Sequence, residues 1–295
     1  MGICYADAKV LLDARTRGLS FDTTLTVGHQ VLFLHPAETR TLKRLYKERF
    51  PDSVNEALVN YVFGDPSDQF LRDFLGVRLL RILDYSQYEG ADLIQDLNEP
   101  VTRDLWNRFD AIIDGGSLEH VFNFPNAISS LMKMLKVGGS IFIACPANNL
   151  CGHGFYQFSP ELMFRVFSEE NGFQLQRVFF CKAMFPSVER TPHSGAAYEI
   201  ADPMLVGRRV GLVSNKPVIM RVEAKKLSDR ELFKVPPLQS DYLVAWRGEG
   251  LRKEDRFLRK LIARLPSRVS RMLLGVREMR EYSLSNSHVY RKRKL

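Results

Sequence analysis

The sequence predicts an α/β fold around a mostly parallel sheet, because short apolar runs alternate with helical patterns along its 295 residues. The clearest such unit lies between Phe109 and Pro146. One apolar run ends at Asp114, a helical segment closes at Gly138-Gly139, and a second apolar run follows. Ligands of parallel sheets bind at the carboxyl ends of the strands. We therefore expect the functional site at this edge.

The elements before Asp84 follow from local signals. Thr24 to Val27 is predicted to form the first strand and to end at Gly28. Pro36 is placed to open a helix, because proline suits the first helical position. Ser67 is predicted to cap a short helix that stops at Gly76, a residue type typical of helix C-termini.

The remaining elements continue the alternation of strands and helices, and Gly172 is expected to end the helix that begins at Ser159-Pro160. The predicted strands and helices are, in order, Val77 to Leu83, a short strand around Leu93, Phe109 to Ile113, the helix Pro125 to Lys136, Ser140 to Cys145, the helix from Ser159-Pro160, and Phe173 to Cys181. Two apolar runs flank Ser214-Asn215-Lys216-Pro217 and predict a β-hairpin over 210–226. Asp241 to Trp246 is predicted to be the last strand.

Positive charge is concentrated at the C-terminal end. Residues 251–295 hold 14 Lys or Arg against 4 Asp or Glu, and the whole chain has a net charge of +8, so residues 1–250 are close to neutral. This argues against a nucleic-acid-binding surface over the whole protein. The four cysteines are scattered, which fits a reducing, cytoplasmic setting.

Several segments together resemble the class I S-adenosylmethionine-dependent methyltransferases. They are the acidic strand ends at Asp84 and Asp96, FDAIIDGGSLEHV, and LKVGGSIFIACP. The segments FYQFSPE and PLQSDYLVAW are similar to small-molecule and glycan O-methyltransferases. The resemblance implies a Rossmann-like methyltransferase fold with a seven-stranded sheet, its last strand antiparallel, flanked by helices. Residues 1–250 would form this domain, with 182–240 as an insertion containing the hairpin.

The resemblance also implies S-adenosylmethionine as cofactor and assigns its contacts. Asp84, followed by Tyr85, matches the position that binds the ribose hydroxyls, and a carboxylate suits that diol. Asp96 and Leu97 match the adenine position, although Asp96 could instead belong to an Asx turn in DLNEP. Asp114 and Gly115 match the methionine end.

The loop after the first strand departs from the family pattern. Gly28, His29 and Gln30 stand where several glycines are usual, so Gly28 and His29 are the expected cofactor contacts there. The imidazole of His29 could obstruct the cofactor or replace a usual contact. An alternative is therefore a catalytically inactive methyltransferase-fold protein that binds or scaffolds a partner, and a further one is a Rossmann-like enzyme that uses a nucleotide-sugar.

Three side chains are candidates for catalysis. Transfer of a methyl group to a hydroxyl needs a base, and neutral imidazole can accept a proton near pH 7. His153 lies in a glycine-rich segment after a strand, and Glu119-His120 follow another strand end. Each histidine could instead be a satisfied loop residue. The three could together hold a divalent metal, but their spacing is not a recognised metal-ligand pattern, so we expect no metal.

The acceptor is expected to be a small molecule or glycan, and the resemblance suggests a role in surface polysaccharide biosynthesis. No nucleic-acid partner is expected. Residues 251–295 are predicted to form a basic helical tail. Within it, apolar residues from Phe257 to Leu265 share one helical face with basic neighbours, which suggests either peripheral membrane contact or packing on the domain. Arg291 to Lys294 is expected to be a frayed end.

Overall fold

The computed structural model of the chain describes residues 2–51, 61, 63–184, 187, 190, 195–247, 261–262 and 264–294. Short 3-10 helices occur at Arg103–Leu105 (η1), Leu118–His120 (η2) and Glu169–Asn171 (η3). The α-helices are α1 (Tyr5–Thr16), α2 (Pro36–Arg49), α3 (Asp68–Leu75), α4 (Phe124–Met134), α5 (Pro160–Val166), α6 (Pro203–Val206), α7 (Ser240–Trp246) and α9 (Ser267–Glu281). The strands are β1 (Gly2–Cys4), β2 (Thr23–Val27), β3 (Val31–Phe33), β4 (Leu79–Asp84), β5 (Leu93–Ile94), β6 (Phe109–Asp114), β7 (Leu135–Asn148), β8 (Phe173–Lys182), β9 (Ala196–Ile200), β10 (Val218–Lys226) and β11 (Tyr290–Lys294).

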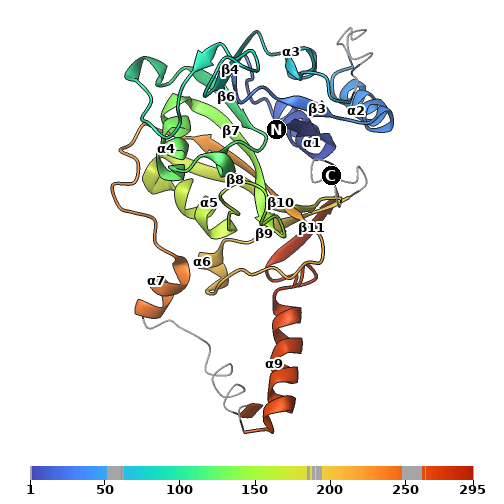
Figure 1. Cartoon of the computed structure of the whole chain (residues 1–295), viewed down its shortest axis with the longest axis vertical. Coiled ribbons are helices and arrows are strands. Elements are labelled where there is room, and N and C mark those ends of the chain that lie inside the picture. Colours follow the sequence, from blue (N-terminus) through green and yellow to red (C-terminus); the bar gives the residue numbers. More distant parts are fainter. Residues whose placement is uncertain are drawn as a thin grey trace.

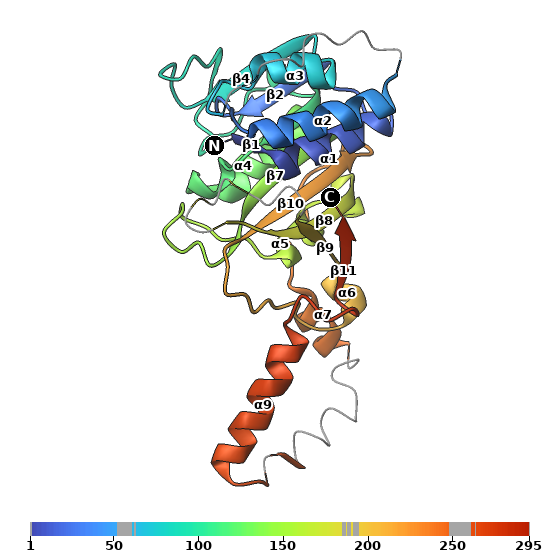
Figure 2. The ribbon, with the colours of Figure 1, turned by 90° about the vertical axis from the view of Figure 1, so that its right-hand side faces the viewer.

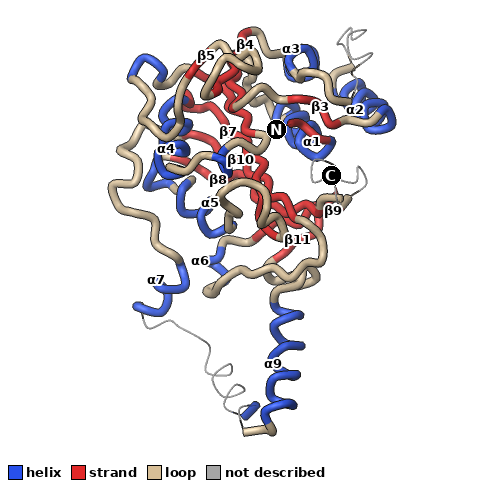
Figure 3. Tube along the Cα trace, viewed as in Figure 1, coloured by secondary structure: helices blue, strands red, loops and turns tan. Residues whose placement is uncertain are grey.

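A nine-stranded mixed sheet forms the centre of the molecule (Figures 1 and 3). Its order is β11-β9-β8-β10-β7-β6-β2-β4-β5. The strands from β5 to β7 pair in parallel, and all pairs from β7 to β11 are antiparallel. The α/β class is confirmed, but the expected seven-stranded sheet is wrong, because β9 and β11 extend the sheet beyond β8.

The antiparallel strand is not the one that the sequence suggested. Asp241 to Trp246 was predicted to be the last strand, but it lies in helix α7, and a short apolar run does not by itself distinguish the two. The strand inserted between β7 and β8 is β10. Its residues Val218 to Lys225 pair on both sides, and the charged Arg221 and Glu223 within this apolar run form ion pairs with Asp7 and Arg17.

The predicted hairpin over 210–226 is also absent, since only its second run is a strand. The backbone before β10 bonds instead to the C-terminal segment. Val213 N donates to Tyr282 O at 2.8 Å, and the Tyr290 hydroxyl donates to Gly211 O at 2.6 Å. These bonds replace the cross-strand ladder that a hairpin would need.

The C-terminal end is ordered into a strand rather than frayed. β11 pairs with β9, with Tyr290 opposite Ile200 and Arg293 opposite Ala197. Arg293 Nε also donates to the Glu199 carboxylate at 2.8 Å. The tail is therefore not helical throughout: α9 is followed by an edge strand. Most of the helical face predicted from Phe257 to Leu265 lies outside the described residues.

Helices cover both faces of the sheet and create two hydrophobic clusters. Helices α1, α2 and α3 lie on one face (Figure 2), and α4 and α5 pack on the other. Successive side chains of a strand point to opposite faces of the sheet, so each strand contributes to both hydrophobic clusters. Ile112 belongs to the α4 cluster, whereas its neighbours Ala111 and Ile113 belong to the α1–α3 cluster.

The N-terminal segment lies at the carboxyl edge of the sheet. β1 pairs in parallel with β3 in a separate two-stranded sheet. Gly2 N donates to Gly115 O at 3.2 Å, so this segment sits beside the end of β6. None of the helices in the described part of the chain has the length and apolar character that a membrane crossing requires.

Truncating a side chain of β10 tests its place in the core. Met220 is fully buried between β7 and β8, so Met220→Ala should lower the free energy of unfolding by about 2 to 5 kcal/mol in urea titrations. Met220→Leu conserves volume and should cost less than about 1.5 kcal/mol. Equal, small losses in both variants would contradict an interior position for this strand.

Candidate functional site

Buried hydrogen bonds join the ends of β6 and β2. Asp114, the last residue of β6, is 1% exposed, and its Oδ1 accepts from Ser117 N at 2.7 Å. The Ser117 hydroxyl donates to Val27 O at 2.6 Å, at the end of β2. The turn that follows β6 is therefore fixed to the neighbouring strand, and it delivers Glu119 and His120 to the carboxyl edge.

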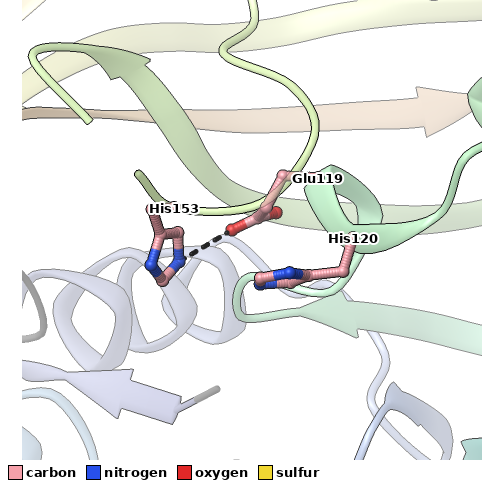
Figure 4. A group of neighbouring side chains, drawn as sticks. All are labelled: Glu119, His120 and His153. Carbon is pink, nitrogen blue, oxygen red and sulfur yellow. Dashed lines mark ion pairs between the residues drawn. The ribbon is translucent and has the colours of Figure 1, made fainter. Parts of the chain in front are cut away.

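Glu119 and two histidines form a cluster at this edge (Figure 4). Glu119 is 1% exposed, and its Oε2 has no hydrogen-bond partner among the described residues. Its Oε1 lies 3.5 Å from Nε2 of His153. The rings of His120 and His153 meet edge to face, with centroids 5.2 Å apart. The structure thus brings together all three side chains that were predicted to be catalytic.

Glycine allows the second histidine to approach. Gly154 has a φ of +75°, and a Cβ at this position would lie 2.8 Å from Glu119 O. Phe155 N donates to the same oxygen at 2.7 Å. The segment after β7 therefore packs directly on the Glu119 backbone and carries His153 to the carboxylate.

Burial changes the acid–base properties of the cluster. Desolvation raises the pKa of Asp114 to about 6, against the hydrogen bonds that Ser117 donates to it. Desolvation, and then repulsion from Asp114, raises the pKa of Glu119 to about 8. Burial and the neighbouring His153 lower the pKa of His120, so its imidazole stays neutral near pH 7. The cluster thus combines a carboxyl that holds a proton with an imidazole that can accept one.

A narrow space, here called the inner pocket, contains this cluster. It has a volume of about 90 Å³ and lies between β1, α1 and the ends of β6, β7 and β10. Besides the cluster, its polar lining includes Cys4, Asp7 and Arg221. Arg221 is 4% exposed, and its Nε donates to Asp7 Oδ1 at 2.6 Å. This pair therefore forms part of the pocket lining together with the histidines.

A larger space, here called the strand-end cleft, lies at the ends of β2, β4 and β5 and has a volume of about 480 Å³. Its lining residues are Val27, Gly28, Leu83, Asp84, Tyr85, Gln95, Asp96, Leu97, Asn98, Ser117, His120 and Val121. His120 lines both this cleft and the inner pocket. The two spaces therefore meet at one imidazole.

Most of the predicted cofactor contacts converge on the strand-end cleft. Gly28, Asp84, Tyr85, Asp96 and Leu97 all line it, although they come from three different strand ends. Asp96 also forms the Asx turn that the sequence left open, because its Oδ1 accepts from the Asn98 backbone at 2.8 Å. The turn and the cleft position are compatible, since the turn fixes the carboxylate at the cleft wall.

The other predicted contacts lie elsewhere. Asp114 is buried behind the edge, and Gly115 lines the inner pocket rather than the cleft. His29 is not among the lining residues of the cleft. Its Nδ1 lies 2.6 Å from Glu89 O and its Nε2 lies 2.9 Å from Asp68 Oδ1. His29 therefore links helix α3 to the loop after β4.

Sequence reasoning missed Gln30, which organises the loop after β2. Its side chain is fully buried, and its Nε2 donates to Val27 O at 2.6 Å. A Cβ on Gly115 would lie 2.2 Å from Gln30 Oε1, so only glycine fits there. A polar residue two positions after Gly28 is typical of a solvent-exposed loop, so no local signal in the sequence indicates that Gln30 is buried. Arg221 was also missed, although a cation inside the apolar run VIMRVEA did mark it.

The Glu119 cluster is also a possible ligand set for a cation. One ligand atom from each of Glu119, His120 and His153 lies within 4.8 Å of the others. Two imidazoles and a carboxylate suit divalent transition metals. The expectation that the protein uses no metal stays a prediction.

Comparison with known proteins gives distant structural likenesses. No family model and no curated protein matches the sequence. The trans-methyltransferase CalH in complex with SAH is 11% identical, with 73% of this chain covered, 54% of that chain and a TM-score of 0.37. A putative methyltransferase from Bacillus halodurans is 12% identical, with coverages of 76% and 100% and a TM-score of 0.37. The N-methyltransferase NodS from Bradyrhizobium japonicum is 13% identical, with coverages of 76% and 87% and a TM-score of 0.36.

The chain spans about half the length of CalH, the full length of the Bacillus halodurans protein and 87% of the length of NodS. Scores and identities this low do not by themselves assign an activity. What this chain does has to be inferred from its own side chains.

The raised pKa of Glu119 predicts a pH-dependent stability difference. The folded protein keeps a proton that the unfolded chain releases between about pH 4.5 and pH 8, so wild-type stability falls as the pH rises through this window. Glu119→Gln lacks this titration. The free energy of unfolding of the variant relative to wild type should therefore increase from pH 5 to pH 8, by at least about 1 kcal/mol.

Urea titrations at both pH values, with a chelator present, measure this difference. Groups that do not interact with Glu119 titrate alike in both proteins and cancel in the comparison, so the difference reports Glu119 together with its neighbour Asp114. Parallel pH profiles of the two proteins would show that Glu119 is ionised at its ordinary pKa.

Proposed function

We propose that this chain is an S-adenosylmethionine-dependent methyltransferase that transfers a methyl group to a hydroxyl of a small molecule or sugar. The observation that carries the proposal is the position of His120 between the strand-end cleft and the inner pocket. A donor site and an acceptor site that share an imidazole place a proton acceptor beside the line of transfer. Such alignment supplies much of the rate of a displacement reaction.

The strand-end cleft fits the proposed cofactor in size and polarity. Its volume of about 480 Å³ is in the range of small-molecule sites. Asp84 and Asp96 supply carboxylates suited to a ribose diol and an amino-substituted base, and Gly28, with a φ of +75°, leaves the backbone open to close approach. When bound, S-adenosylmethionine would supply an electrophilic methyl group on a sulfonium.

The acid–base cluster would handle the proton of the acceptor. The neutral imidazole of His120 accepts the hydroxyl proton as the oxygen attacks, and its lowered pKa keeps it free to do so. His153, edge to face with His120 and 3.5 Å from the Glu119 carboxylate, positions the ring. The inner pocket, lined by Arg221 and Asp7, would receive the acceptor beside this ring.

The acceptor class extends the proposal by analogy. The similarity of FYQFSPE to glycan methyltransferases favours a sugar hydroxyl, and a role in polysaccharide biosynthesis would follow from it. An amine is the competing acceptor, because the same imidazole could take a proton from nitrogen.

One observation favours the alternative of an inactive binding protein. The loop after β2 has one glycine, and the buried Gln30 side chain holds it by hydrogen bonds to Val27 O and Gly28 O. Such a loop is rigid and leaves less backbone to approach a cofactor. Cofactor binding therefore decides between the two readings.

Titration with S-adenosylhomocysteine tests the cofactor site. We expect calorimetry to show micromolar binding, and Asp84→Asn to weaken it at least tenfold, because a hydrogen bond to a charged group contributes roughly 1.5 to 3 kcal/mol. Asp104→Asn, an exposed residue outside the cleft, is the matched control. Absence of heat with folded wild-type protein would support the inactive alternative.

Replacing the histidines tests the division of roles, with candidate hydroxyl acceptors screened for methyl transfer. His120→Asn should lower kcat by about 10² to 10⁴, the usual contribution of general acid–base catalysis. His153→Asn should lower kcat less than His120→Asn. Because His153 lowers the pKa of the His120 imidazole, this loss should change with pH. His288→Asn, on the exposed segment before β11, should have wild-type activity. A larger loss for His153→Asn than for His120→Asn would assign the base to His153.

A further inference from the structure

Helix α9 projects from the body of the protein. Both ribbon views show it extending away from the sheet and from the other described helices (Figures 1 and 2). It has 15 residues, and none of them is buried. A helix of this length that stands apart from its own core needs a partner to cover whatever apolar surface it has.

One face of α9 is apolar and exposed. Side chains at positions i, i+3, i+4, i+7 and i+10 share this face, and they are between 39% and 62% exposed. They are Val269, Met272, Leu273, Val276 and Met279. We call these five residues the α9 stripe.

Positive charge borders the α9 stripe. Three arginines are exposed on this helix: Arg268 flanks the stripe near its N-terminal end, Arg280 lies on the stripe face near the C-terminal end, and Arg271 lies on the opposite side. One of its two acids, Glu281, is already paired, because Arg208 donates to it at 2.6 Å. The helical spacing puts the other acid, Glu278, on the side opposite the stripe. The helix therefore presents an apolar strip bordered by an arginine near each of its ends.

Exposed aromatic residues lie at the same end of the molecule. Helix α7 lies at the same end of the molecule as the base of α9, although Figure 1 shows the two apart. It carries Tyr242, 49% exposed, and Trp246, 69% exposed. Tyrosine and tryptophan are enriched where proteins meet the boundary between lipid and water.

We propose that α9 is an interfacial anchor that binds the surface of an anionic membrane, with the α9 stripe in the acyl boundary and its arginines at the lipid headgroups. An amphipathic helix with a basic border binds in this way. At about 1.5 Å per residue, α9 is about 22 Å long, shorter than the roughly 30 Å hydrocarbon core. It therefore lies in the interface and does not cross the bilayer.

Charge favours a membrane over a second copy of the chain. Two α9 helices packed stripe to stripe would bring their arginine borders together, and like charges at close range are repulsive. Anionic headgroups neutralise the same arginines. Each basic residue near such a surface adds to the attraction, which salt then screens.

Sedimentation of the full chain with vesicles tests the proposal. We expect binding to phosphatidylglycerol–phosphatidylcholine vesicles, at least tenfold weaker binding to pure phosphatidylcholine, and loss of affinity at high salt. The variant Met272→Glu with Val276→Glu should bind at least tenfold less than a charge-matched control, Ser267→Glu with Ser270→Glu, which adds the same two charges outside the stripe.

Each other result overturns the anchor. Equal losses in the two double variants would show attraction by charge alone, with no insertion of the stripe. Wild-type protein that stays in the supernatant would show no membrane affinity. A dimer in sedimentation velocity that only the stripe variant dissociates would identify a second copy as the occupant. Circular dichroism checks that both variants stay folded.

Discussion

The hydrogen bonds between Asp114, Ser117 and Val27 fix the geometry on which the candidate site depends. They join the end of β6 to the end of β2 inside the protein, where water cannot compete. The turn they hold forms the wall between the strand-end cleft and the inner pocket. This fixed turn leads directly into η2, which places His120 at both spaces.

Placing two carboxyls behind this wall has an electrostatic consequence. Asp114 and Glu119 are both buried, and Asp114 Oδ2 and Glu119 Oε2 have no partners among the described residues. Burial of two acids at once favours a shared proton over two charges. The exposed imidazole of His120 and the half-exposed imidazole of His153 complete the cluster and connect the buried carboxyls to solvent. Unpaired buried oxygens lower the stability of the fold. Such groups are more typical of functional sites than of structural ones.

The antiparallel strand β10 connects this chemistry to the N-terminal segment. Its Arg221 is buried, and it donates to Asp7 on α1 and contacts Cys4 Sγ at 3.0 Å. A buried cation needs such a partner, so the ion pair holds α1 and β1 against the end of the sheet. The inner pocket is narrow because these N-terminal residues occupy part of the edge. Residues more than 200 positions apart in the chain thus share one wall.

The sequence by itself determined the α/β class and the strands β2, β4, β5, β6 and β7, because alternating apolar runs and glycine stops are local signals, and it predicted the carboxyl edge as the place of the candidate site. It also singled out Glu119, His120 and His153, because they follow the ends of predicted strands. Only the tertiary structure decided that β10 is the antiparallel strand, that α7 is a helix and that β11 pairs with β9. Short apolar or basic runs fit either conformation, and their partners in the fold select one. Gln30 and the meeting of two spaces at His120 also required the fold, since both arise from contacts between segments far apart in the sequence.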